Sequence, residues 1–172
     1  MTSWIGAVAA SYAGRTTRSR RIRQAESARA SGSANQAAAV TSIDSSADAL
    51  ATARANVARN PALPASACAW VEADAFADLR RLRNEGATFD AIVLDPPKFA
   101  PTAAHAERAA RAYKDINLLA LKMLVLGGLL LTFSCSGGIS AELFQKIVAG
   151  AALDAGAVAQ IQKRLAASAD HP

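Results

Sequence analysis

The clearest pattern in the chain is a short apolar run, Ala91–Leu94, which has an aspartate on each side. A run of this kind, partly β-branched and bounded by polar residues, predicts a strand buried on both faces of a parallel sheet. Pro96 and Pro97 end the strand, because neither can donate a backbone N–H. Asp95 is then expected at the carboxyl edge of the sheet, where open α/β sheets bind ligands. The alternative is a strand that ends in a proline-stiffened turn and has no ligand.

Strand-like and helix-like segments alternate around this run. Further strands are predicted at residues 40–44, 68–71, 129–133 and 158–161, and helices at 47–60, 75–84, 102–123 and 140–153, the third of them in two pieces. Gly127 and Gly128 predict a turn before the strand at 129–133. This alternation favours an α/β fold with a parallel, doubly wound sheet.

Three acids follow three successive predicted strands: Asp44, Asp74 and Asp95. An acid at the end of the second strand of a nucleotide-binding sheet accepts hydrogen bonds from ribose hydroxyls. The next acid is then placed for an adenine amine, and the third for the reacting centre. Each aspartate alone is more often a cap or turn residue. The shared position of all three favours a ligand site.

Cys135 follows the predicted strand at 129–133, at the same edge as Asp95. An isolated cysteine is usually a small buried hydrophobic residue. Carbon 5 of cytosine, however, is a poor nucleophile, and its methylation requires prior attack on carbon 6. A thiolate can make that attack. A cysteine and an Asp-Pro-Pro turn at one sheet edge fit this chemistry.

Composition indicates one globular domain, since the 172 residues are 52% hydrophobic and 19% charged. No apolar run is long enough to span a membrane. Cys68 and Cys135 are far apart and indicate neither a disulfide framework nor a metal site. We therefore expect a reducing, cytoplasmic environment, with no metal and no membrane partner. The oligomeric state is open.

The net charge of +5 lies entirely in residues 1–39, which hold six arginines and one glutamate. Residues 40–172 carry equal numbers of acidic and basic side chains, so the domain itself is not expected to present a basic nucleic-acid patch. The first segment has no clear strand period. It fits a basic arm for RNA, a transit peptide, or sequence foreign to the domain through a wrong start or a shifted reading frame.

At this point the chain resembles a known family, the S-adenosylmethionine-dependent methyltransferases that make 5-methylcytosine in large-subunit ribosomal RNA. The resemblance covers residues 40–172. The segments that carry it are VTSIDSSADAL, DAIVLDPPKFA, RAYKDINLLALKML, GGLLLTFSCSG and ELFQKIVAGAALDAG. It implies a Rossmann-like methyltransferase fold, S-adenosylmethionine as methyl donor and ribosomal RNA as partner.

The resemblance also implies roles for particular residues. Asp44, with Ser45, would hold the ribose hydroxyls of the donor, and Asp74 would lie beside the adenine. Asp95 would line both the donor and the base site, and Cys135 would be the nucleophile. The remaining motif positions fall near the target pocket: Pro96, Pro97, Lys98, Phe99, Tyr113, Lys114 and Asn117. Tyr113 fits a core position equally well, and both lysines fit solvated ones.

The chain departs from the family before Asp44. The family has a first strand and a glycine-rich loop there, which holds the carboxypropyl end of the donor, and this strand lies between those ending in Asp44 and Asp95. Where a glycine pair is expected, this chain has Glu26 and Ser27. We therefore expect 1–39 to be a segment that is disordered or foreign to the domain, with a frame-shifted or misassigned start favoured, and 40–172 to be a partial methyltransferase domain.

Two other functions remain open. A methyltransferase acting on an adenine or glutamine nitrogen also uses an Asp/Asn-Pro-Pro turn, but usually with an aromatic residue directly after the prolines. Here Lys98 precedes Phe99, and TFSCSG has no purpose in that chemistry. The other alternative is a non-catalytic remnant, which the missing glycine loop favours.

Overall fold

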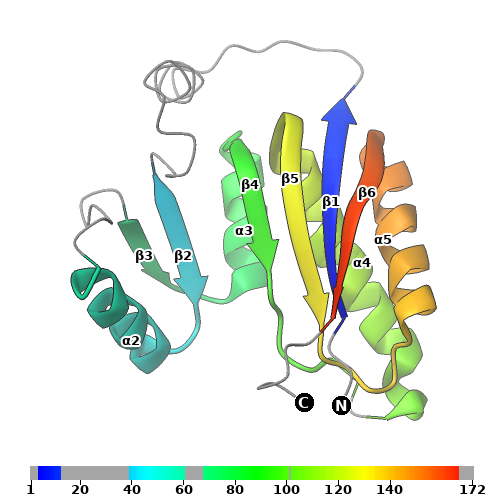
Figure 1. Cartoon of the computed structure of the whole chain (residues 1–172), viewed down its shortest axis with the longest axis horizontal. Helices are drawn as coiled ribbons and strands as arrows, with labels where there is room; N and C mark the ends of the chain where they lie inside the picture. The colour runs from blue at the N-terminus through cyan, green and yellow to red at the C-terminus, as the bar shows by residue number, and fades with distance from the viewer. Residues whose placement is uncertain (1–3, 13–38, 61–67, 101, 167–172) are drawn as a thin grey trace. The chain divides into compact units, whose positions relative to one another are not determined.

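A computed structural model describes residues 4–12, 39–60, 68–100 and 102–166 (Figure 1). The arginines of the first segment, together with Glu26 and Ser27, lie outside these residues, as do residues 61–67. The chain divides into two compact units. One contains the first strand and the chain from Leu79 onward, and the other ends at Asp78. Each unit is described separately below.

The larger unit contains a four-stranded sheet in the order β4 (Phe89–Leu94), β5 (Leu124–Ser134), β1 (Trp4–Tyr12) and β6 (Ala157–Ala166). Strands β4 and β5 are parallel, whereas β1 is antiparallel to both β5 and β6. Helices α4 (Ala106–Met123) and α5 (Ala141–Ala155) lie together behind this sheet in Figure 1. A short 3₁₀ turn, η2 (Ala103–His105), leads into α4.

Helix α4 supplies much of the core because its buried side chains recur every three or four residues. Tyr113, Ile116 and Ala120 lie on this buried stripe. Helix α5 begins where the Ser140 hydroxyl accepts a hydrogen bond from the Leu143 N–H at 3.2 Å, and it ends at Gly156 in the left-handed conformation. These two helices place the loops at the ends of β4 and β5 on a packed support.

The smaller unit contains two parallel strands, β2 (Val40–Asp44) and β3 (Cys68–Glu72), with helix α2 (Ala47–Ala58) between them in the chain. The Ser46 hydroxyl caps α2 by accepting from the Ala49 N–H at 3.2 Å. Beyond the strands, the Ala73 N–H donates to the Asp44 carbonyl at 3.0 Å. Helix α3 (Ala75–Asn84) follows β3 directly.

The α/β class and most elements are as predicted, including the two-piece helix before β5. The predicted turn at Gly127–Gly128 is wrong, because both residues lie inside the longer strand β5. Gly127 has a φ of 77°, and the pairing register of β5 with β4 shifts between Phe89 and Ala91. A side chain at Gly128 would meet the Val125 carbonyl at 2.9 Å. The two glycines therefore allow the strand to bulge and continue.

Strand β1 was not predicted, since its sequence lacks the alternation that marks a half-buried strand. It forms through backbone pairing along β5 and β6, which supply hydrogen-bond partners on both sides. Its antiparallel direction makes the sheet mixed rather than wholly parallel. Whether residues 1–39 belong to the native domain stays a prediction.

The expected continuous sheet is divided into two among the described residues. Strand β2 pairs only with β3, and β4 lies at the edge of the four-stranded sheet. The family resemblance predicts one further strand between β2 and β4, and without such a strand the ladder cannot connect them. Among the strands that the structure describes, none pairs with the outer edge of β4.

This edge leads to a prediction about self-association. Val93 lies on β4 with 62% of its surface exposed, and an apolar edge strand is a template for pairing with another chain. We expect Val93→Lys to reduce light scattering of the purified 172-residue chain. The control is Leu153→Lys, because Leu153 is 80% exposed but lies on helix α5 rather than on a strand. Equal effects of the two substitutions would show that general surface apolarity, not the edge, drives association.

Candidate active site

Asp95 and Cys135 follow two neighbouring parallel strands. Leu94, the last residue of β4, pairs with Thr132 of β5, and each strand then leads into a loop. The first loop carries Asp95 to Ala100, and the second carries Cys135 to Gly138. The larger unit thus places the predicted nucleophile and the predicted carboxylate at the same sheet edge, as expected.

The Cys135 thiol lies against the proline turn. Its sulfur is 3.9 Å from the Pro96 carbonyl oxygen, to which the S–H donates, and the side chain is half-buried. Pro96 is buried, whereas Asp95, Pro97 and Lys98 are exposed. A partly accessible sulfur thus lies beside the rigid turn that follows an exposed carboxylate.

Ser136, the residue after the cysteine, joins the two loops. Its hydroxyl oxygen accepts hydrogen bonds from the Phe99 N–H and the Ala100 N–H, both at 3.0 Å. A main-chain bond from the Gly138 N–H to the Ala100 carbonyl, at 3.3 Å, adds to this connection. The cysteine loop and the Asp-Pro-Pro loop are therefore bonded to each other directly.

Tyr113 of helix α4 lies beneath the two loops and exposes none of its surface. Its hydroxyl is 2.9 Å from the Ser136 hydroxyl and accepts from the Ser134 hydroxyl at 3.0 Å. Its ring packs against Phe99 at 4.8 Å and edge-on against Phe144 at 5.3 Å between centroids. Of the two readings of Tyr113, the structure supports the core position; a contact with the target base stays a prediction.

Lys114 follows Tyr113 on α4, and Asn117 lies one turn further along the same helix. Asn117 is fully buried, and its side-chain N–H donates to the Tyr113 carbonyl at 2.8 Å. The Lys114 ammonium pairs with Asp154 of α5 at 2.8 Å. Its aliphatic stem passes 3.6 Å from the position that a Cβ atom would occupy at Gly150. Lys114 thus links α4 to α5, whereas the Asn117 bond lies within α4. A role of either residue in a target pocket stays a prediction.

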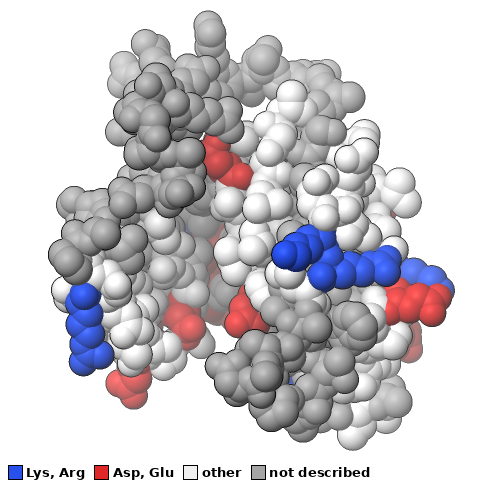
Figure 2. Space-filling view, in the orientation of Figure 1, with Lys and Arg blue, Asp and Glu red and all other residues white. Residues whose placement is uncertain are grey.

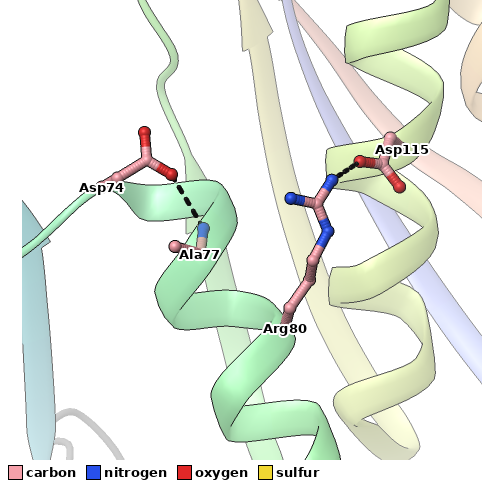
Figure 3. Close-up of polar contacts among 4 residues, drawn as sticks. All are labelled: Asp74, Ala77, Arg80 and Asp115. Carbon is pink, nitrogen blue, oxygen red and sulfur yellow. Dashed lines mark hydrogen bonds and ion pairs between the residues drawn. The ribbon is translucent and has the colours of Figure 1, made fainter.

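The predicted donor-binding acids lie in the smaller unit, after neighbouring parallel strands. Asp44 pairs with Glu72 in the ladder, and Asp74 follows two residues later. The Asp44 carboxylate accepts from the Ser46 N–H at 2.7 Å, and the Asp74 carboxylate accepts from the Ala77 N–H at 2.8 Å, as Figure 3 shows for Asp74. Ser45 is exposed between Asp44 and the start of α2.

These bonds are the cap and turn contacts that the alternative reading of each aspartate predicts. In both carboxylates, however, only Oδ1 makes the bond, and both side chains are exposed. Each carboxylate is therefore oriented by a backbone N–H on a residue that is exposed to solvent. Structural capping and ligand binding are compatible at these two positions.

Figure 3 also shows an ion pair between Arg80 of α3 and Asp115 of α4. Both side chains are largely exposed, so the pair contributes little to stability.

On the face seen in Figure 2, basic side chains of the described residues form a short band beside acidic ones and a separate group, not a continuous basic surface. This distribution agrees with the balanced charge of residues 40–172.

Ser134 and Ser136 are the site residues that sequence reasoning missed. Ser134 ends β5, and Ser136 follows Cys135 in the next loop. No local pattern indicates that a serine hydroxyl will bond to backbone N–H groups 36 and 37 residues earlier in the chain. The available signal was two hydroxyls flanking a strand-end cysteine, which suggests polar partners but does not identify them.

Within the described ranges, no three His, Cys, Asp or Glu side chains are grouped so that they could hold a metal ion. A helix long and apolar enough to cross a membrane is likewise missing from this part of the chain.

Curated proteins include close relatives of this chain. It is 55% identical over 136 residues to ribosomal RNA large subunit methyltransferase I of Shewanella amazonensis, 52% over 136 residues to that of Shewanella denitrificans, and 50% over 133 residues to that of Cronobacter sakazakii. The matching segment of this chain is similar to part of these ribosomal RNA large subunit methyltransferases. It covers 77–79% of the chain but only 33–34% of each relative's length.

A solved structure shows the same fold. The crystal structure of SMU.776 complexed with SAH aligns over 70% of this chain and 30% of its own, with a TM-score of 0.56 and 24% sequence identity. At this identity the likeness concerns the fold, which is a Rossmann-like methyltransferase fold. A search of protein-family models finds no match.

Proposed function

We propose that this chain carries the catalytic segment of an S-adenosylmethionine-dependent methyltransferase that modifies carbon 5 of a cytosine in large-subunit ribosomal RNA, in the cytoplasm. The observation that carries the proposal is the Cys135 thiol held 3.9 Å from the Pro96 carbonyl of the Asp-Pro-Pro turn. The names of the relatives support the substrate class.

The chemistry assigned to Cys135 is covalent activation of the ring. Its thiolate adds to carbon 6 of cytosine, and the electron pair of the 5,6 double bond moves toward the ring carbonyl and makes carbon 5 nucleophilic. S-adenosylmethionine supplies an electrophilic methyl group to carbon 5 when it is bound. Loss of the carbon 5 proton then expels the thiolate and restores the ring. The net result is one methyl group gained and one proton released.

The Asp-Pro-Pro turn is assigned the positioning of the base. The two prolines fix the backbone after Asp95, so the carboxylate and the turn carbonyls stay in one orientation. Asp95 is exposed and its carboxylate can accept a hydrogen bond from the exocyclic amine of cytosine. Phe99, half-buried against Tyr113, and the exposed Pro97 and Lys98 complete the loop that would face the RNA.

The smaller unit is assigned the donor. Asp44 and Asp74 fit this group because each is an exposed residue whose carboxylate is oriented by a backbone N–H. By the geometry of nucleotide-binding sheets, Asp44 would accept from the ribose hydroxyls, with Ser45 beside it, and Asp74 would lie near the adenine.

The test is a chimaera in which residues 40–172 of this chain replace the matching segment of the Shewanella amazonensis relative. The chimaera is incubated with unmodified large-subunit ribosomal RNA and S-adenosylmethionine labelled in the methyl group, and the RNA is digested to nucleosides. The proposal predicts labelled 5-methylcytidine. Label in a methylated adenosine would support the nitrogen-directed alternative, and an unlabelled RNA with a folded chimaera would support a non-catalytic remnant.

A separate prediction concerns donor binding by the 172-residue chain itself. Glu26 and Ser27 stand where the family has its glycine loop, so backbone donors for the carboxylate of the donor are not expected. Each lost charge-assisted hydrogen bond costs on the order of 1.5–3 kcal/mol, or roughly a tenfold to hundredfold loss in affinity. We expect binding weaker than micromolar by calorimetric titration, with the chimaera as the positive control. Micromolar binding by the 172-residue chain would contradict this.

A further inference from the structure

The loops that carry Asp95 and Cys135 are joined by a buried group of hydroxyls from Tyr113, Ser134 and Ser136, which we call the hydroxyl clamp. We propose that Ser136, oriented by Tyr113, is a positioning residue that holds the cysteine loop against the Asp-Pro-Pro loop. The catalytic role of this positioning residue rests on the proposed function. The clamp itself is a feature of the larger unit and can be tested without a methylation assay.

The geometry of Ser136 carries the proposal. Its side chain is 3% exposed, yet its oxygen accepts from two successive backbone N–H groups, those of Phe99 and Ala100, both at 3.0 Å. No main-chain ladder reaches these two groups, since β4 ends at Leu94. The hydroxyl of the residue next to the nucleophile thus satisfies the backbone donors of the loop that carries Asp95.

The number of donor and acceptor sites on each hydroxyl determines the direction of the remaining hydrogen bonds. A hydroxyl has one donor and two acceptor sites, and Ser136 uses both acceptor sites on the two N–H groups. Its own proton therefore points to the Tyr113 oxygen, 2.9 Å away. Tyr113 also accepts from Ser134 at 3.0 Å. The phenol oxygen is thus the common acceptor that orients a serine on each side of Cys135.

Tyr113 can serve as this fixed point because it cannot move easily. Its ring lies between Phe99 and Phe144, at 4.8 and 5.3 Å, and its backbone carbonyl accepts from Asn117. Phe99 is itself a member of the Asp-Pro-Pro loop, so Tyr113 contacts both loops at once. Removing the hydroxyl of Tyr113 should free the rotation of Ser136, whereas removing the Ser136 hydroxyl should free the loop N–H groups directly.

The first experiment measures residue-resolved amide hydrogen exchange in the 172-residue chain by NMR. In Ser136→Ala, the amides of Phe99 and Ala100 should exchange about tenfold faster relative to the core amide of Leu130, because they lose their acceptor. Tyr113→Phe, which keeps the ring and its packing, should cause a smaller increase at the same two amides. If Ser136→Ala does not fold, Tyr113→Phe still tests the clamp.

Ser140→Ala is the matched control. It removes a serine hydroxyl from the same part of the chain, the N-cap of α5, which bonds only to the Leu143 N–H among the contacts described. A general loss of stability would speed exchange at all core amides in either variant. Selective exchange at Phe99 and Ala100 in the two clamp variants, and not in Ser140→Ala, supports the clamp; unchanged or uniformly raised exchange overturns it.

The second experiment connects the clamp to catalysis in the chimaera. Displacement of a reacting group by about 1 Å can cost on the order of a hundredfold in rate. Ser136→Ala should therefore lower kcat by about this factor, while KM for S-adenosylmethionine is unchanged, because the acids assigned to the donor, Asp44 and Asp74, belong to the other compact unit. Equal loss in kcat and in donor affinity overturns the positioning role.

The two experiments separate the clamp from the proposed function. If the chimaera with intact Cys135 does not make 5-methylcytidine, the proposed function fails, but the exchange result still decides the clamp. A second outcome is an active chimaera in which Ser136→Ala retains full kcat although the Phe99 and Ala100 amides have lost their protection. The clamp then exists without a positioning role, and this inference is wrong.

Discussion

Cys135→Ala is expected to abolish cytosine methylation by the chimaera while leaving S-adenosylmethionine binding nearly unchanged. The thiol is needed only to activate carbon 6 of the base, whereas the donor is assigned to Asp44 and Asp74 in the other compact unit. Methylation should fall below detection in a labelled-methyl assay, and the Kd of the donor should change less than about twofold, as expected for a residue that acts on the transition state alone.

Cys68→Ala is the matched control for this substitution. Cys68 begins β3, where it pairs with Val40, and is half-buried, so its loss should cost only a modest packing energy. Activity close to that of the unaltered chimaera is expected.

A trapping experiment makes the role of the thiol visible. RNA with 5-fluorocytosine at the target position blocks the last step, because fluorine cannot leave carbon 5 as a proton does. A covalent protein–RNA adduct should then accumulate with Cys135 present and vanish in Cys135→Ala. An adduct that persists in the variant, or residual methylation by it, would make Cys135 a structural cysteine and would favour the nitrogen-directed alternative.

Tyr113→Ala is expected to have the largest effect on stability. Tyr113 is fully buried, packs against Phe99 and edge-on against Phe144, and joins the loops through its hydroxyl. Truncation of a buried aromatic side chain typically costs about 3–5 kcal/mol, which is a large share of the roughly 5–15 kcal/mol that stabilises a domain. Urea unfolding followed by circular dichroism should show a strongly lowered midpoint, or an unfolded variant.

Tyr113→Phe divides this effect into its parts. It keeps the two ring contacts and removes only the oxygen that Ser134 and Ser136 contact, so a loss of about 1–3 kcal/mol is expected. If Tyr113→Ala lowers the free energy of unfolding no more than Tyr113→Phe does, the ring contributes little, and the described packing of α4 against the loops is wrong.

The local pattern of the sequence was sufficient for the elements and for the strand-end position of the functional residues. The Ala91–Leu94 run followed by two prolines predicted β4 and its abrupt end, because proline cannot continue a ladder. The helix predicted at 140–153 corresponds to α5, which Ser140 caps at its start. These features depend on near neighbours in the chain, which is why they can be read without the fold.

Strand β1 and the continuation of β5 through Gly127 and Gly128 could not be read in this way. The strand Trp4–Tyr12 exists through pairing with β5 and β6, more than a hundred residues away in the chain. The two glycines favour a turn locally, but Gly128 pairs with Ala10 of β1, and the register with β4 shifts across this stretch so that β5 continues with a bulge. In both cases long-range backbone pairing outweighs local preference.

By itself, the sequence determined the α/β class, the aspartates at the strand ends and the strand-end cysteine with its proline turn, since each follows from local propensity and residue chemistry. Only the tertiary structure decided what holds the cysteine in place. Tyr113, Ser134, Ser136 and Phe99 come from three separate parts of the chain, and their bonds form only after α4 packs beneath the two loops. The physical reason is that hydrogen bonds between distant residues depend on the packing of whole elements, which no local pattern records.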